Sequence, residues 1–338
     1  MKIALDAMGG DNAPLSTIKG AVISLNEIKD LTIVLVGVQN KIESELSKYT
    51  YDKSRIEILN APDIIGMEDD PVSAVKTKKN SSMNITLDCV KDNVADASVS
   101  AGNTGALITA SQLKLKRIKG VLRPAIAAAF PNKKGGHMVV LDVGATSDCK
   151  PEFLNQYAMM GSKYMEILFG SKNPKVGLLN IGTEEGKGNE ITRDAYDLLK
   201  ANKSINFAGN IESSEFFNGD IDVIVTDGFT GNMVLKTSEG IVKFVGSLLK
   251  DEISKSILGK IGAFLLMPSF KKMKLRIDSS EHGGAIFLGL NGISVKAHGN
   301  SDHIAIKNAI KVAYKFAKLN FVNELKGVIN IITEEMES

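Results

Sequence analysis

"KVGLLNIGTEEGKGNEITRDAYDLLKAN", residues 175–202, contains the pattern that decides the fold. Its apolar run at 175–182 predicts a β-strand, the glycine-rich stretch after it predicts a tight turn, and the spacing of apolar residues at 189–202 predicts a helix. A strand joined to a helix by a short turn is the unit from which parallel α/β sheets are built. If the unit recurs along the chain, the fold is a parallel sheet covered by helices.

The unit does recur along most of the chain. Further apolar runs predict strands at 2–8, 31–37, 55–61, 95–102, 125–130, 137–144 and 222–228. Helical patterns lie between most of them, at 15–29, 71–92, 104–117, 151–169 and 231–250. The strands are apolar nearly throughout, so both faces of the sheet are expected to be buried. The alternation predicts an α/β fold with a doubly wound, mostly parallel sheet sandwiched by helices.

One connection departs from this pattern. Only "PNKKGG" separates the strands at 125–130 and 137–144, which leaves no room for a helix, so these two strands are expected to pair antiparallel. The chain has no repeat and no low-complexity linker. Residues 1–338 are therefore expected to form a single α/β domain, with a helical excursion at about 240–276.

The composition is that of an ordinary globular protein. The 338 residues are 43% hydrophobic and 24% charged, with a net charge of +2, so nothing global indicates a nucleic-acid partner. The N-terminal stretch lacks a long apolar h-region, and no apolar run approaches the ~18 residues of a membrane span. Cys89 and Cys149 are the only cysteines, which fits a reducing cytosol. A cytoplasmic protein is expected.

Polar, glycine-rich stretches follow five of the predicted strands. They are "DAMGGDNAP" (6–14), "SAGNTGA" (100–106), "LDVGATSD" (141–148), "NIGTEEGKGN" (180–189) and "TDGFTGN" (226–232). In open α/β sheets, ligands bind outside the carboxyl ends of the strands, often at helix N-termini. If all five ends point one way, they form an anion-binding crevice. The alternative is that these are ordinary turns in which Asn and Thr cap the next helix.

Lys187 stands between Gly186 and Gly188, where an ammonium group and bare backbone N–H groups can both approach an anion. The stretch is not a nucleotide P-loop. Gly182 and Gly186 are one residue too close, and Gly188 replaces the hydroxyl that would bind magnesium. The neighbouring glutamates would also repel a triphosphate. A smaller anion is expected.

These residues carry a resemblance to a known family. The opening "MKIALDAMGGDNAP", with "SAGNTGA", "LDVGAT", "TEEGKGN", "TDGFTGN" and "HGGAIFLGLNG…KAHGNSD", resembles the bacterial phosphate acyltransferases of phospholipid synthesis from residue 1 to about 331. The resemblance implies a fold similar to phosphotransacetylases and isocitrate/isopropylmalate dehydrogenases. It implies transfer of an acyl group from acyl carrier protein to inorganic phosphate, with no cofactor. It also implies a homodimer at the membrane surface that passes acyl phosphate to a glycerol-3-phosphate acyltransferase.

The resemblance places the loop of Lys187 in the active site. Lys187 is the first catalytic candidate, because it can neutralise phosphate; the alternative is an exposed lysine paired with Glu184 or Glu185. Asn232 is the second, as an amide donor to the thioester oxygen; the alternative is a helix N-cap. The remaining candidates for binding phosphate or substrate are Asn103, Thr104, Gly102, Thr183, Gly186, Gly188, Gly231, Asp6, Gly9, Gly10, Asp142 and His298.

Among these candidates, Asp6 and Asp142 are expected to orient the loops more than to touch an anion, since like charges repel. His298 is either a phosphate donor or proton shuttle, or a structural histidine that caps the last helix. His137, His282, His298 and His303 are scattered and accompany no metal motif, so no metal site is expected. Direct attack by phosphate is favoured over an acyl-enzyme on Cys149, which lacks a histidine nearby in sequence.

Two surfaces suggest partners. Residues 112–123 supply Lys114, Lys116, Arg117, Lys119 and Arg123, which suit an acidic carrier protein or form a merely solvated face. The stretch 256–276 is apolar beyond the needs of one helix stripe and carries lysines, as expected of a helix in the membrane surface. Its candidate membrane contacts are Ile257, Leu258, Ile261, Phe264, Leu265 and Leu266. The competing interpretation is a dimer interface or a buried hairpin.

Other functions fit the sequence less well. A decarboxylating dehydrogenase on this sheet needs a metal and an arginine-rich clamp, and the five stretches contain no arginine. A phosphotransacetylase that uses coenzyme A is chemically closer, and physical reasoning about the residues does not separate it from the carrier-protein enzyme. A non-catalytic membrane scaffold would explain 256–276 but not five ligand-like strand ends.

Overall fold

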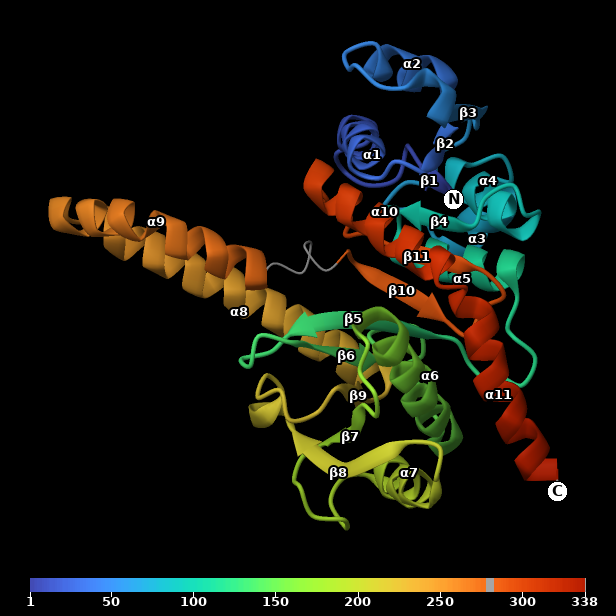
Figure 1. Cartoon of the computed structure of the whole chain (residues 1–338), viewed down its shortest axis with the longest axis vertical. Helices are drawn as coiled ribbons and strands as arrows, with labels where there is room; N and C mark the ends of the chain where they lie inside the picture. Colours follow the sequence, from blue (N-terminus) through green and yellow to red (C-terminus); the bar gives the residue numbers. More distant parts are fainter. Residues whose placement is uncertain (278–282, 338) are drawn as a thin grey trace.

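The computed structural model describes the backbone of residues 1–277 and 283–337 and the side chains of residues 1–273 and 283–329. Two lobes share one sheet, and a pair of long helices projects from the body as an arm (Figure 1). The upper lobe contains the N-terminal strands, and the lower lobe contains the strands from the middle of the chain. The predicted α/β fold is confirmed.

Eleven strands form the sheet, in the order β3-β2-β1-β4-β11-β10-β5-β6-β9-β7-β8. Their bounds are β1 Lys2–Asp6, β2 Thr32–Gly37, β3 Ile56–Asn60, β4 Ala97–Ser100, β5 Ala125–Pro131, β6 His137–Leu141, β7 Lys175–Asn180, β8 Asn206–Glu212, β9 Val223–Val225, β10 Ala285–Leu288 and β11 Ile293–Lys296. All the predicted strands are present. β8, β10 and β11 were not predicted: β8 is rich in polar residues, and β10 and β11 are short strands on either side of the glycine-containing turn "GLNG".

The sheet consists of two parallel blocks joined through antiparallel strands. β1, β2, β3, β4 and β11 are parallel to one another, as are β6, β7, β8 and β9. Between the blocks, β10 pairs antiparallel with both β11 and β5, and β5 pairs antiparallel with β6. The antiparallel pair predicted around "PNKKGG" is therefore confirmed, with Ala127 opposite Leu141.

Helices cover both faces of the sheet. Their bounds are α1 Leu15–Glu27, α2 Gln39–Leu46, α3 Pro71–Thr77, α4 Ser82–Lys91, α5 Thr104–Leu115, α6 Pro151–Phe169, α7 Glu190–Ala201, α8 Gly228–Ser254, α9 Ile257–Ile277, α10 His303–Lys318 and α11 Phe321–Glu337. The apolar sides of α1, α6, α7, α10 and α11 form the core on one face. Those of α3, α4, α5 and the first turns of α8 pack on the other, where the candidate site lies.

The single helix predicted at 71–92 is wrong, because the chain forms α3 and α4 with a break between them. Ser81 caps α4 by accepting a hydrogen bond from the backbone of Asn84. The buried Asn84 amide donates to the carbonyl oxygens of Val75 and Lys78, at 3.0 Å each, which holds the turn closed. Local side-chain bonds to the backbone thus replace a turn of helix.

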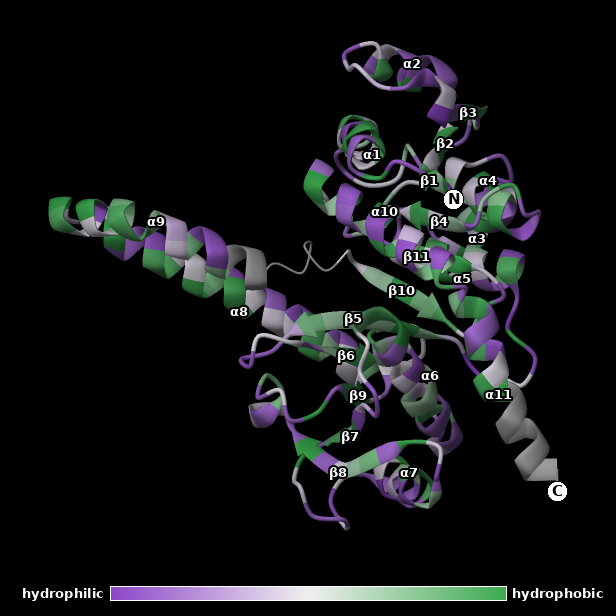
Figure 2. Ribbon diagram, in the orientation of Figure 1, coloured by the Kyte–Doolittle hydropathy of each residue, from purple (hydrophilic) through white to green (hydrophobic). Residues whose placement is uncertain are grey.

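α8 and α9 form the arm, which corresponds to the helical excursion expected near 240–276. From Gly240 to Glu252 every residue of α8 is exposed. Hydrophobic residues colour much of both helices (Figure 2). Beyond the first turns of α8, which contact the core through Val234 and Leu235, the two helices pack mainly against each other, and α9 also contacts β5. Among the described residues, none of the helices combines the length and apolar character needed to cross a bilayer.

Candidate functional site

Three strands of the lower lobe end at the same edge of the sheet, with β6 and β9 level and β7 two residues longer. Val225 of β9 lies opposite Leu141 of β6 and Leu178 of β7. The stretches that follow these strands, 142–148, 226–232 and 180–189, therefore share one edge of the sheet; we call them the lower loops. Lys187 and Asn232, the two catalytic candidates, both belong to the lower loops.

Three strands of the upper lobe end level in the same way. Val99 of β4 lies opposite Leu5 of β1, and Ser100 lies opposite Lys296 of β11. We call the stretches 7–13, 101–103 and 297–302 the upper loops. Glycines allow them to meet closely: a Cβ atom at Gly10 would lie 2.8 Å from the carbonyl oxygen of Gly299, and one at Gly9 would lie 2.9 Å from the nitrogen of Gly102.

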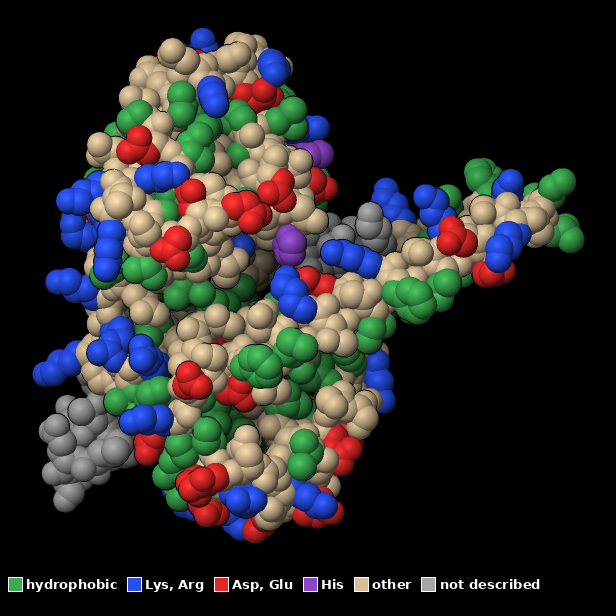
Figure 3. Space-filling model, turned by 180° about the vertical axis from the view of Figure 1, so that it is seen from behind, with side chains coloured by type: hydrophobic (Ala, Val, Ile, Leu, Met, Phe, Trp, Pro, Cys, Tyr) green, Lys and Arg blue, Asp and Glu red, His purple; other side chains and the backbone are tan. Residues whose placement is uncertain are grey.

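The prediction that all five strand ends point one way is wrong. The antiparallel strands in the middle of the sheet reverse its direction, so β6, β7 and β9 run opposite to β1 and β4 along the ladder. α8 connects the two sets of loops: it begins at Gly228 in the lower loops, and Glu239, three turns on, contacts His298 of the upper loops. A hollow between the two lobes lies at the root of the arm (Figure 3).

Asp142 organises the lower loops and is buried. Its carboxylate accepts hydrogen bonds from the backbone nitrogens of Ile126 (2.9 Å), Gly144 (3.1 Å), Ala145 (3.0 Å) and Thr146 (2.8 Å). Burial raises its pKa, and the four N–H groups oppose this effect. With its oxygens occupied, Asp142 shapes the loop and is not placed to bind an anion.

Asn232 lies in the second turn of α8, not at its start. The helix begins at Gly228 and is capped by Asp227, which accepts a hydrogen bond of 2.8 Å from the nitrogen of Thr230. The alternative role for Asn232 as an N-cap is therefore wrong. Its side chain is exposed next to Gly144 and makes no hydrogen bond within the described part of the chain, so its amide is available to a ligand.

Lys187 is held through its backbone, and its exposed ammonium forms only a weak ion pair. The amide nitrogen of Asn180 donates to the carbonyl oxygen of Lys187 at 3.1 Å, and Gly188 follows with a φ of +94° that favours glycine. The Lys187 ammonium is 4.0 Å from Glu184, a long and exposed ion pair worth little. Thr183 and Gly186, also predicted for the site, are exposed in the same loop.

Most upper-loop candidates have structural contacts. Asp6 is buried and accepts hydrogen bonds from Ser100 Oγ (2.7 Å) and the nitrogen of Met8 (3.2 Å), while burial raises its pKa. Asn103 caps α5 and donates to the carbonyl oxygen of Met67 at 2.8 Å. Gly102, Asn103 and Thr104 were all predicted to bind phosphate or substrate. Of these three, only Thr104, at the start of α5, is exposed.

Lys296 is a further candidate residue; it opens the motif "KAHGNSD", but no role in the site was predicted for it. It ends β11, a strand that was not predicted, and its ammonium donates to the carbonyl oxygen of Ala297 at 2.8 Å. Burial, with Lys236 nearby, lowers its pKa to about 8. His298 lies beside it, and burial lowers its pKa as well. The idea that His298 caps the last helices is wrong for α10, because Asp302 caps it.

Cys149 is buried among carboxylates. Burial and the charges of Asp142 and Asp227 raise the pKa of its thiol to about 12. A thiol with this pKa is scarcely ionised near neutral pH, so the surroundings oppose its use as a nucleophile. No group of three or more His, Cys, Asp and Glu residues in the described ranges is arranged to hold a metal ion. His282 lies outside the described residues.

The two predicted partner surfaces are largely exposed. In the basic stretch, Lys114 pairs with Asp88 at 2.7 Å, whereas Lys116, Arg117, Lys119 and Arg123 are exposed. Basic side chains gather on the flank opposite the arm (Figure 3). On α9, all six candidate membrane contacts are more than half exposed.

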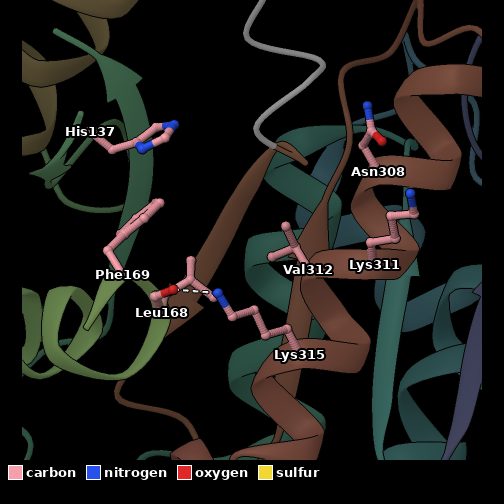
Figure 4. A pocket seen from close by; sticks show the side chains of 7 residues that line it. All are labelled: His137, Leu168, Phe169, Asn308, Lys311, Val312 and Lys315. Carbon is pink, nitrogen blue, oxygen red and sulfur yellow. Dashed lines mark hydrogen bonds between the residues drawn. The ribbon is translucent and has the colours of Figure 1, made fainter. Parts of the chain in front are cut away.

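A cavity of about 240 Å³ between the lobes is separate from both sets of loops. Its walls include His137 and Phe169 from the lower lobe and Lys311 and Lys315 from α10 (Figure 4). The ring of His137 stacks on that of Phe169 with centroids 4.6 Å apart. Lys315 donates to the carbonyl oxygen of Leu168, and Lys311 pairs with Glu27. Lys315 thus joins the two lobes, whereas Lys311 joins α10 to α1 within the upper lobe, and none of the predicted site residues lines the cavity.

Comparisons with known proteins show the family of the chain and agree with its fold. Residues 1–324 match the family model described as fatty acid synthesis protein. The chain is 62% identical to a phosphate acyltransferase of Fusobacterium nucleatum over 98% of this chain and 100% of that one. It is 48% identical to a phosphate acyltransferase of Clostridium tetani, over 98% and 99% of the two chains. Its fold is similar to that of a phosphotransacetylase from Streptococcus pyogenes, with a TM-score of 0.63, 16% identity and 94% of each chain covered.

Proposed function

The chain belongs to the phosphate acyltransferase family of fatty acid synthesis proteins, and from this premise we propose that it transfers a fatty acyl group from acyl carrier protein to inorganic phosphate. The product is acyl phosphate, an activated acyl donor for phosphatidic acid synthesis. The observation that supports this most strongly is the edge shared by the lower loops, with the Asn232 amide, which makes no hydrogen bond within the described residues, and the exposed ammonium of Lys187.

The proposed reaction is direct attack on a thioester. A phosphate oxygen forms a bond to the carbonyl carbon, the carbonyl oxygen becomes an oxyanion, and the C–S bond then breaks to release the thiolate, which takes a proton from water. Asn232 donates to the oxyanion, and Lys187 neutralises the negative charge brought by phosphate. The raised pKa of Cys149 supports this route over an acyl-cysteine intermediate.

Exposed apolar side chains next to Asn232 suit a fatty acyl chain. Phe229 and Met233 lie one turn apart on α8 on either side of Asn232 in sequence, and both are more than half exposed. Ile181, which follows β7 in the lower loops, is 82% exposed. Apolar residues this exposed beside polar groups are typical of a surface that binds an apolar ligand.

The exposed basic side chains of residues 112–123 are proposed to bind the acyl carrier protein. Lys116, Lys119 and Arg123 are exposed and make no ion pair within the described residues. Unpaired cations attract an acidic protein and speed its association.

The arm is proposed to bind the membrane surface and a second copy of the chain. Beyond the first turns of α8, the two helices pack mainly on each other and leave Phe264, Leu265 and their apolar neighbours in water, which is costly unless a partner covers them. A homodimer placed by its arms on the cytoplasmic face of the membrane would deliver acyl phosphate to a glycerol-3-phosphate acyltransferase.

An end-point assay tests the reaction. Purified protein is mixed with palmitoyl-loaded carrier protein and inorganic phosphate without added metal, and acyl phosphate is trapped as its hydroxamate. Phosphate-dependent product is expected. Product from acyl-coenzyme A but not from loaded carrier protein would instead support the phosphotransacetylase-like alternative. No product from either donor, with folding and loading verified, would contradict the proposed activity and leave the scaffold role.

A further inference from the structure

One face of α8 leads from Asn232 to the upper loops. Asn232, Lys236 and Glu239 are spaced i, i+4 and i+7, so they lie on one side of the helix, with Lys236 and Glu239 about 6 Å and 10 Å beyond Asn232 along its axis. Lys236 Nζ is 3.1 Å from Glu239 Oε2. The same carboxylate oxygen is 3.9 Å from Nε2 of His298.

Lys296 faces the same space from the sheet. Residues two apart in a strand point to the same side, and Ser294 contacts Ser111 of α5 with 3.3 Å between their hydroxyl oxygens. Lys296 therefore projects toward the face that carries α5. The first turns of α8 pack on this face too, since Val234 and Leu235 contact its core.

The Lys296 ammonium is only partly satisfied. An ammonium group has three donors, and Lys296 uses one, to the carbonyl oxygen of Ala297. No acidic side chain forms an ion pair with it in the described part of the chain, and the nearby charges are Lys236, Glu239 and His298. A half-buried cation with two free donors, next to a second cation, is arranged to receive an anion.

We propose that Lys296 and Lys236, together with His298, bind inorganic phosphate about one helical turn from Asn232. This inference rests on the proposed function, in which phosphate is the acyl acceptor. Two ammonium groups and one carboxylate leave a net positive charge for the phosphate dianion. The anion would lie next to the amide that is proposed to hold the carbonyl oxygen, which brings the nucleophile close to the thioester carbon.

Glu239 gives the site a means of selecting phosphate over sulfate. Hydrogen phosphate has one P–OH group, which can donate to a carboxylate, whereas sulfate has no proton at neutral pH. A carboxylate next to the bound anion therefore stabilises hydrogen phosphate and repels sulfate.

Titration calorimetry with inorganic phosphate tests the site without any acyl donor. Lys296→Met and Lys236→Met are each expected to raise the Kd for phosphate about tenfold or more, the loss expected for one charge-assisted hydrogen bond. Lys250→Met, in the exposed part of the same helix, is the matched control and should bind phosphate as the wild type does. Sulfate should bind the wild type at least about tenfold more weakly than phosphate, and Glu239→Gln should narrow this gap.

Two results would overturn the inference. One is that the wild type does not bind phosphate. The other is that the folded Lys296→Met and Lys236→Met variants both bind phosphate as the wild type does. Equal binding of phosphate and sulfate would remove the role of Glu239. Because binding is measured without turnover, the two proposals can fail separately. Phosphate binding that both substitutions weaken, in a protein that makes no acyl phosphate, would keep the site and reject the reaction. If the protein makes acyl phosphate but both variants bind phosphate as the wild type does, the reaction is kept and the proposed phosphate site is rejected.

Discussion

A Cβ atom at Gly231 would lie 1.9 Å from the carbonyl oxygen of Asp142, so the first turn of α8 packs directly on the backbone that follows β6. Only glycine permits this contact. It ties two lower loops together and places Asn232, the next residue, beside Gly144. The position of the candidate amide donor thus depends on a glycine that has no side chain to react.

Gly231→Ala is therefore expected to lower the free energy of unfolding by about 1–3 kcal/mol and to reduce turnover, since the helix must move away from Asp142. Thermal unfolding and the acyl phosphate assay measure the two effects. Gly240→Ala, in the same helix with nothing within 4 Å, is the control and should be neutral or stabilising by up to about 1 kcal/mol. Equal effects of the two substitutions would refute the packing argument.

Lys187→Ala and Asn232→Ala are each expected to lower the acyl-transfer rate about 100-fold or more, as on the loss of one positioned donor. Both side chains are exposed, so the fold should survive, and circular dichroism checks this. Lys203→Ala, an exposed lysine outside the lower loops, should keep the wild-type rate. A wild-type rate in either folded site variant would remove that residue from the mechanism.

Cys149→Ala is expected to retain most of the activity, because burial and two aspartates raise the pKa of this thiol to about 12 and keep it protonated. Mass spectrometry of wild-type protein mixed with the acyl donor, but without phosphate, should show no acyl group attached. A stable acyl adduct at Cys149 would instead establish the covalent route.

Phosphate binding should weaken as the pH rises through about 8. Lys296 has a pKa lowered to about 8, so it carries its charge below that pH and loses it above. The facing groups are Lys236, Glu239 and Lys243 of α8 and His298. Calorimetric Kd values between pH 7 and 9.5 measure the change. In Lys296→Met, the Kd for phosphate should change less with pH than in the wild type. An equal pH dependence in that variant would show that another group titrates.

Replacement of Leu265 and Leu266 by glutamate is expected to abolish binding to anionic liposomes while activity in solution remains. Both side chains are exposed on α9, far along the chain from the loops. Vesicle sedimentation measures the binding, and light scattering measures the oligomeric state. Lys271 and Lys272 are exposed lysines of the same helix. Replacing them by glutamate measures how much of the liposome binding comes from charge and how much from apolar contact. A dimer that dissociates in the leucine variant would show that these residues form the subunit interface.

Long, apolar, periodic segments were predictable from local sequence. The strands β1 to β7 and β9, the helix α6 and the antiparallel pair around "PNKKGG" all follow from runs of residues whose preference is set by near neighbours. The helix predicted at 71–92 failed because Asn84 bonds to the backbone of Val75 and Lys78, a contact that hydrophobic spacing does not express.

The sequence by itself determined the fold class, the family and the polar loops at the strand ends, because these depend on composition, spacing and motifs along the chain. Only the tertiary structure decided which of those loops meet. The reversal of the sheet at β10 and β5 separates the upper from the lower loops, and α8 reconnects them through Glu239 and His298. It also brought Lys296, at the end of a four-residue strand, close enough to Lys236 for their charges to interact. A contact such as that between Glu239 and His298, which are 59 residues apart in the chain, arises from packing, which no local pattern encodes.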